Sequence, residues 1–215
     1  MDVQVHILPL GSLQTNCYLV TETASAKTLC IDPGGKPDTV SDYAAGHRMS
    51  VECIVLTHGH GDHIGAVAPL KKLWQVPVRI HPADAAMLGC ALQNLSAYVG
   101  EHVTAPNADA FLHDGELFSF GSTTVRVLHT PGHTPGGVCL FIGDADTGPI
   151  LFSGDTLFDH EVGRCDLPGG SLAVLENSVR DKLYCLPDET VVYPGHGPAT
   201  TIGVEKHENP YVRIA

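Results

Sequence analysis

The sequence has few basic residues, no long apolar run and no closely spaced pair of cysteines. Its 215 residues include 12 Lys and Arg against 24 Asp and Glu, which gives a formal net charge of −12. Because this excess of negative charge repels phosphate groups, we expect no nucleic-acid partner and no binding to an anionic membrane surface. No stretch of the sequence approaches the roughly 18 apolar residues of a membrane span.

The seven cysteines are too scattered to indicate a disulfide framework or a cysteine-based zinc site. The nearest pair, Cys17 and Cys30, is 13 residues apart, and no Cys-x-x-Cys motif is present. This pattern is typical of reduced thiols that behave as small apolar side chains. The first residues, MDVQVHILPLG, carry an acidic second position and a short apolar run, which does not resemble a signal peptide. We therefore expect a cytoplasmic protein.

Apolar residues and histidine are well represented. With 43% hydrophobic and 17% charged residues, the chain can form its own core, and its length favours one domain over residues 1–215. Histidine, with 13 residues, outnumbers Lys and Arg combined. Because histidine is the commonest metal ligand, the positions of its clusters indicate where a metal site would lie.

Short strand-like runs alternate with helical segments along the chain. Expected strands cover 3–8, 16–22, 27–32, 53–57, 76–81, 119–120, 123–129, 138–142, 150–153 and 190–193, with a turn at 144–148. Expected helices cover 39–48, 64–75 with a late start or kink at Pro69, 83–92 and 172–186, whereas 100–114 shows no clear period. This order predicts an α/β domain of layered sheets and helices, in which polar residues beyond strand ends form the site.

The segment Thr57-His58-Gly59-His60-Gly61-Asp62-His63 directly follows one of these strands. It places three imidazoles and a carboxylate within six residues, and the glycines allow the backbone to fold closely around a ligand. Imidazole nitrogen and carboxylate oxygen suit zinc, and they also accept iron or manganese. The alternative is a glycine-rich turn with solvated histidines.

Three further strands each end in a glycine next to a potential ligand. These ligands are His133 in PGHT, Asp155 in SGDT and His196 in PGHG. Each turn alone is weak evidence, but together with the first segment they present five histidines and two aspartates at strand ends. This recurrence predicts a metal centre built from all four turns.

At these motifs the sequence resembles the metallo-β-lactamase-fold hydrolases. The resemblance rests on THGHGDHIGA, PGHTPG, SGDTLF and YPGHGP and extends over nearly the whole chain. It implies an αββα sandwich. It also implies one metal ion held by His58, His60 and His133, a second held by Asp62, His63 and His196, and Asp155 as a bridging ligand.

Two further stretches, GRCDLPGG at 163–170 and GPATTIG at 197–203, look like those of the short glyoxalase II-like hydrolases. This resemblance implies hydrolysis of a small acyl thioester such as S-lactoylglutathione, by attack of a hydroxide held on one or two zinc ions. Asp62 would orient that hydroxide and then take its proton. Only 19 residues follow His196, so we expect no C-terminal helical glutathione-binding domain.

Arg164 is the candidate for binding a substrate carboxylate, because a guanidinium can hold a carboxylate through two hydrogen bonds. The alternative is a surface arginine paired with a neighbouring aspartate.

Other proteins of the same fold carry different residues at two of these positions. Asp155 stands where the commonest β-lactamases have cysteine, and His60 stands where flavodiiron proteins have glutamate, which argues against both. The Gly-Arg-x-Asp pattern at 163–166 is shared with iron-dependent persulfide dioxygenases, which remain an alternative. A lactonase and a non-enzymatic domain stabilised by metal are further alternatives, although seven candidate ligands exceed the four of a closed structural zinc site.

Overall fold

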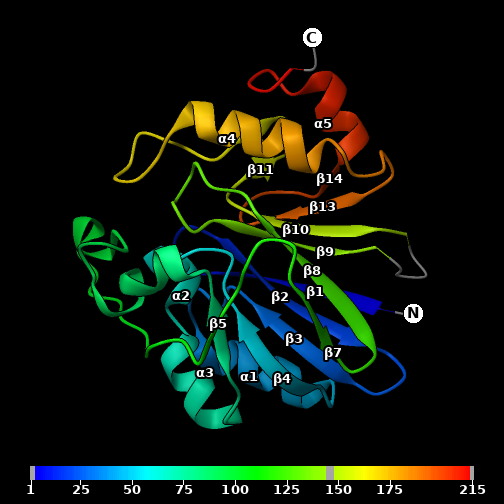
Figure 1. The fold of residues 1–215 in the computed structure, drawn as a ribbon. Helices are drawn as coiled ribbons and strands as arrows, with labels where there is room; N and C mark the ends of the chain where they lie inside the picture. The colour runs from blue at the N-terminus through cyan, green and yellow to red at the C-terminus, as the bar shows by residue number, and fades with distance from the viewer. Residues whose placement is uncertain (1–2, 144–147, 214–215) are drawn as a thin grey trace.

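Two six-stranded β-sheets face each other in the computed structural model, which describes residues 3–143 and 148–213 (Figure 1). The first sheet follows chain order: β1 (Val3–Leu10), β2 (Thr15–Glu22), β3 (Lys27–Ile31), β4 (Ser50–Val55), β5 (Val78–Ile80) and β6 (Ala110–Phe111). The second sheet has the order β14 (Thr200–Thr201), β13 (Val191–Pro194), β10 (Ile150–Gly154), β9 (Val138–Ile142), β8 (Thr123–His129) and β7 (Leu117–Phe120). A small hairpin joins β11 (Leu157–Phe158) and β12 (Glu161–Val162).

Helices cover the outer face of each sheet. Figure 1 shows α1 (Pro37–Gly46) and α3 (Val67–Trp74) against the first sheet, and α4 (Leu172–Ser178) and α5 (Ile202–Glu208) against the second. The fold is therefore a layered α/β arrangement, as the pattern of elements predicts, and it is the αββα sandwich that the family resemblance implies. Within the described part of the chain, no helix has both the length and the apolar character needed to cross a bilayer.

Three apolar clusters hold these layers together. Leu29 and Val55 of the first sheet meet Val127 and Leu140 of the second in the central layer, and all four are buried. A second cluster lies between the first sheet and its two helices, and a third lies between the second sheet and α4 and α5. Because strand residues of both faces are covered, β2 is buried along its whole length.

The predicted helices differ from the observed ones at their ends and in their type. The segment expected at 64–75 divides into α2 (Gly61–Ile64) and α3. Pro69 falls in the first turn of α3, where backbone N–H groups have no carbonyl partner within the helix, so the N–H that proline lacks costs no hydrogen bond. The helix predicted at 83–92 is instead a 3₁₀ helix, η1 (Pro82–Gly89). The helix predicted at 172–186 changes after α4 into a π-helical turn, η3 (Val179–Leu183).

Some short elements gave no periodic signal in the sequence. They are β6, β11, β12, β14 and the helices η2 (Ser96–Val99) and α5. Except for α5, which has seven residues, these elements have only two to four residues each. Elements of two to four residues are too short to show periodicity. Most of the turn predicted at 144–148 lies outside the described residues.

The strand directions bring four turns to one edge of the sandwich. Strands β8 and β10 are each antiparallel to β9, and β13 is parallel to β10, so β8, β10 and β13 all end at the same edge of the second sheet. The turn after β4 of the first sheet meets them there, since the backbone N–H of Val138 donates to the carbonyl of Thr57. These are the four turns that carry the predicted ligands.

Candidate metal centre

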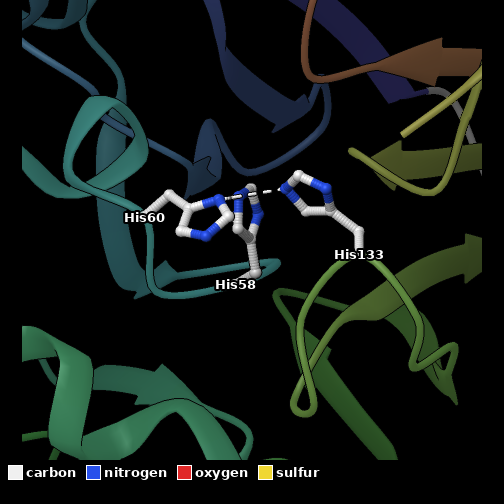
Figure 2. Close-up of side chains that lie close together, drawn as sticks. All are labelled: His58, His60 and His133. Carbon is white, nitrogen blue, oxygen red and sulfur yellow. Dashed lines mark hydrogen bonds between the residues drawn. The ribbon is translucent and has the colours of Figure 1, made fainter. Parts of the chain in front are cut away.

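His58, His60 and His133 converge from two turns. Figure 2 shows the three imidazoles facing one another, with His58 and His60 on the turn after β4 and His133 on the turn after β8. Nδ1 of His60 lies 3.1 Å from Nε2 of His58 and 3.0 Å from Nε2 of His133. All three side chains are buried.

Asp62, His63 and His196 form a second group beside the first. Oδ2 of Asp62 lies 3.2 Å from Nε2 of His196 and 3.5 Å from Nε2 of His63. His63 is buried, whereas the side chains of Asp62 and His196 are 26% and 28% exposed. This second group therefore opens to solvent.

Asp155 lies between the two groups. Its Oδ2 is 3.5 Å from Nε2 of His133 in the first group, and its Oδ1 is 3.4 Å from Nε2 of His63 in the second. Its Oδ2 also lies 3.7 Å from Nε2 of His196. The structure thus brings all seven predicted ligand residues together, with the carboxylate of Asp155 in contact with both groups.

The outward nitrogens of four of these histidines are fixed by other atoms. Nδ1 of His58 lies 3.1 Å from the hydroxyl of Thr57, and Nδ1 of His63 lies 2.9 Å from the carboxylate of Asp32. Backbone carbonyls hold the other two: Arg164 for His133 at 2.8 Å and Leu13 for His196 at 3.0 Å. Such partners set the orientation of each ring and leave Nε2 directed into the centre.

Burial lowers the pKa of histidines in the first group, whereas nearby carboxylates raise the pKa of His63 in the second. Burial, with a smaller contribution from neighbouring imidazoles, lowers the pKa of His60 to about 3 and holds the pKa of His58 well below 6.5. Burial also acts to lower the pKa of His63, but the charges of Asp62, Asp155 and Asp32 outweigh it and raise this pKa to about 10. His58 and His60 are therefore neutral at pH 7, which is the form that binds metal.

The residues present fit a pair of metal ions. In a tetrahedral site with nitrogens about 2.0–2.1 Å from zinc, two ligand nitrogens lie about 3.3 Å apart, close to the separations within the first group. Nε2 of His63 and Oδ1 of Asp155 are buried and have no hydrogen-bond partner among the residues that the structure describes. Leaving buried polar atoms unpaired is costly, and a cation between them would satisfy both.

Arg164 is exposed and engaged with a near neighbour. Its Nε and Nη2 donate to Oδ1 and Oδ2 of Asp166, both at 2.8 Å. This ion pair is the alternative to substrate binding that the sequence pattern leaves open for Arg164. The backbone carbonyl of the same residue orients His133, a contact that cannot be predicted from residue types because any residue can make it.

Two buried aspartates near the centre were not among the predicted site residues. Asp32, in the turn after β3, accepts from the backbone N–H and the hydroxyl of Thr57 at 2.8 and 2.5 Å and also contacts His63. Its position after a strand, in the sequence Asp-Pro-Gly-Gly, is a signal that could have identified it. Asp84 lies on η1 and has no such signal.

The fold and these two ligand groups define a metal-binding hydrolase scaffold. A sequence model of the metallo-β-lactamase superfamily matches residues 10–196. The chain belongs to this superfamily.

Among curated proteins, the chain is similar to a probable metallo-hydrolase, YqgX of Bacillus subtilis, with 38% identity over 95% of each chain. It is also similar to the hydroxyacylglutathione hydrolase GloC of Haemophilus influenzae, with 33% identity over 98% of each chain. Among solved structures, it resembles the B3 metallo-β-lactamase BLEG-1, with 36% identity, a TM-score of 0.92 and coverage of 97% and 99%. TTHA1623 in a di-iron-bound form matches with 38% identity, a TM-score of 0.85 and coverage of 97% and 100%.

Proposed function

We propose that this protein is a metal-dependent hydrolase of small acyl thioesters, with S-lactoylglutathione as the representative substrate. The observation that carries the proposal is the position of Asp155 in contact with both ligand groups, next to the partly exposed Asp62 and His196. A structural zinc site is normally closed by four protein ligands, whereas this centre offers seven and opens to solvent. One or two zinc ions are the proposed cofactor, with His58, His60, His133, Asp62, His63, His196 and Asp155 as ligands.

The metal ions, when bound, would supply an acidified water and a Lewis acid for the thioester carbonyl. Asp62 would orient the attacking water and accept its proton. Its Oδ2 is held by the hydroxyl of Thr15 at 3.0 Å, which fixes the direction of the carboxylate. Burial acts against ionisation of Asp62, but His63 and His196 outweigh it and hold its pKa well below the usual range. The group is therefore a carboxylate at neutral pH and can accept a hydrogen bond from water.

The choice of a thioester is supported by the likeness to GloC, whose name denotes hydrolysis of hydroxyacylglutathione. Such a substrate carries carboxylates, and Arg164 would bind one of them in exchange for Asp166. The backbone carbonyl of Arg164 contacts Nδ1 of His133, so the backbone of this residue lies next to the first ligand group. We place its site of action in the cytoplasm, where thiols such as its seven cysteines stay reduced.

The test is loss of the thioester of S-lactoylglutathione by purified protein whose metal content has been measured. We expect turnover supported by zinc, and loss of turnover in Asp62→Ala. Asp42→Ala, which removes an exposed carboxylate on α1, is the matched control and should behave as the unmodified protein. No thioester loss by fully metal-loaded protein would overturn the proposal.

An iron-dependent persulfide dioxygenase is the second candidate. It is favoured by the Gly-Arg-x-Asp pattern at 163–166, and the likeness to TTHA1623 in its di-iron-bound form supports iron as a metal for this scaffold. Oxygen uptake by iron-loaded protein with glutathione persulfide would establish it. A β-lactam belongs in the same set of assays because of the likeness to BLEG-1.

A further inference from the structure

Asp84 is a fully buried carboxylate that connects the two turns of the first ligand group. It lies on η1, outside the four ligand turns, and its side chain is 0% exposed. Its Oδ2 accepts from the backbone N–H of Gly59 at 3.1 Å and from the hydroxyl of Thr134 at 2.7 Å. Its Oδ1 accepts from the backbone N–H of Gly136 at 2.7 Å.

These donors come from the residues that flank the histidine ligands. Gly59 stands between His58 and His60, and Thr134 directly follows His133. The carboxylate is satisfied by two backbone N–H groups and one hydroxyl, none of which is charged. Because a buried carboxylate is stable only when its oxygens are hydrogen-bonded, the two turns and Asp84 are mutually fixed in position.

The packing around Asp84 leaves no space for the turns to move towards η1. A Cβ added at Gly136 would lie 2.6 Å from Oδ1 of Asp84, and a Cβ added at Gly59 would lie 2.7 Å from the side chain of Met87 on the same helix. Real Cβ atoms essentially never approach so closely. Both turns therefore need glycine at these positions in order to reach the helix that carries Asp84.

The second ligand group is held by different residues. Thr15 donates to Asp62, the carbonyl of Leu13 contacts His196, and Asp32 contacts His63. Loss of Asp84 should therefore affect one group of ligands and spare the other.

We propose that Asp84 is a positioning residue that sets the separation of the His58–His60 turn from the His133 turn and so determines the affinity of the first metal site. The inference rests on the metal-binding part of the proposed function and is independent of the substrate. Removing a residue that orients metal ligands typically lowers metal affinity about 10–100-fold.

The test is metal binding by Asp84→Asn, measured without substrate as competition between the protein and a chelator for zinc. Asparagine has the same shape, but its amide NH₂ would face a donor at one of the two oxygen positions. Two reference variants identify the sites: His60→Ala disrupts the first group, and His196→Ala disrupts the second. We expect Asp84→Asn to lower zinc affinity about 10–100-fold at the site that His60→Ala abolishes, with the other site unchanged.

Glu22→Gln is the matched control. Glu22 is also buried, and its carboxylate accepts from the backbone N–H and the hydroxyl of Ser122 and from the hydroxyl of Ser25, away from the ligand turns. This variant should bind zinc as the unmodified protein does. Equal weakening of both sites by Asp84→Asn, or unchanged binding at both, would overturn the proposal.

Thr134→Val provides a second test if Asp84→Asn does not fold. It removes one of the three donors and keeps the shape of the side chain, so we expect a smaller loss of affinity confined to the same site. Unchanged affinity at that site would contradict the role of Asp84. Zinc binding that follows these expectations in a protein without thioesterase activity would overturn the proposed function and leave this inference intact.

Discussion

Oδ1 of Asp155 lies 3.4 Å from Nε2 of His63, and within 3–143 and 148–213 neither of these buried atoms has a hydrogen-bond partner. His63 lies on α2, which follows β4 of the first sheet, and Asp155 follows β10 of the second sheet, so a cation between the two atoms would tie the two sheets together. Because the ligands are assembled only in the folded chain, metal binding adds to the free energy of unfolding.

Metal removal should therefore lower the thermal stability of the protein. An ion present at 100 times its Kd stabilises the folded state by about 2.7 kcal/mol. For a chain of this size we expect a chelator to lower Tm by about 5–10 °C, and added zinc to restore it. Magnesium, which prefers oxygen ligands, should restore much less. Equal Tm values with and without the chelator would contradict this prediction.

Arg164→Ala should raise KM for a carboxylate-bearing thioester about tenfold and leave kcat within about twofold. A hydrogen bond to a charged group contributes roughly 1.5–3 kcal/mol, and a tenfold change corresponds to about 1.4 kcal/mol. The backbone carbonyl that orients His133 is retained in this variant. Steady-state kinetics on the carboxylate-bearing substrate and on its neutral ester distinguish loss of the ion pair with Arg164 from other effects of the substitution. Asp166→Ala is the complementary variant, and it should lower KM because it frees the guanidinium.

The sequence predicted the ligand turns because they combine strand ends with glycine and polar side chains. His58, His133, Asp155 and His196 each follow an apolar strand, and the directions of these strands place their ends at one edge. This prediction used only local pattern and the general location of sites in layered α/β folds.

The supporting contacts could not be predicted in the same way. His196 is oriented by the backbone carbonyl of Leu13, a contact that any residue type can make and that joins positions 183 apart in sequence. Asp84 comes from a 3₁₀ helix, where no strand end marks it, and its partners at Gly59 and Gly136 lie 25 and 52 positions away. Such contacts depend on the packing of the whole fold.

Asn16→Ala should destabilise the protein and weaken the second ligand group. The buried amide of Asn16 donates to the carbonyls of Pro194 and Gly197 at 3.0 and 2.9 Å and so clamps the turn that carries His196. Each lost hydrogen bond is worth about 0.5–1.5 kcal/mol, so we expect the free energy of unfolding measured with urea to fall by about 1–3 kcal/mol. The exposed Asn107→Ala is the control and should change stability by less than about 0.5 kcal/mol.

The contacts of Glu22 predict a pH-dependent contribution to stability. Glu22 ends β2 of the first sheet, and its carboxylate accepts from the hydroxyl and the backbone N–H of Ser122 in the hairpin between β7 and β8, and from the hydroxyl of Ser25. These hydrogen bonds, those from Ser122 first, lower the pKa of Glu22 from 4.5 to about 2. The folded state therefore favours the ionised carboxylate more than the unfolded state does.

A folded-state pKa below the unfolded value stabilises the protein above pH 4.5, and this contribution is lost as the pH falls from 4.5 towards 2. Glu22→Gln should consequently be less stable than the unmodified protein at pH 6, and the difference should shrink steadily below pH 4.5. Urea unfolding of both proteins at matched pH values measures this difference directly, because effects of acid on the metal ligands are common to both. The exposed Glu189→Gln corrects for the loss of one negative charge. A difference that stays constant from pH 6 to pH 3 would show that Glu22 acts through packing alone, since only the ionised carboxylate gains from the two serines and the backbone N–H.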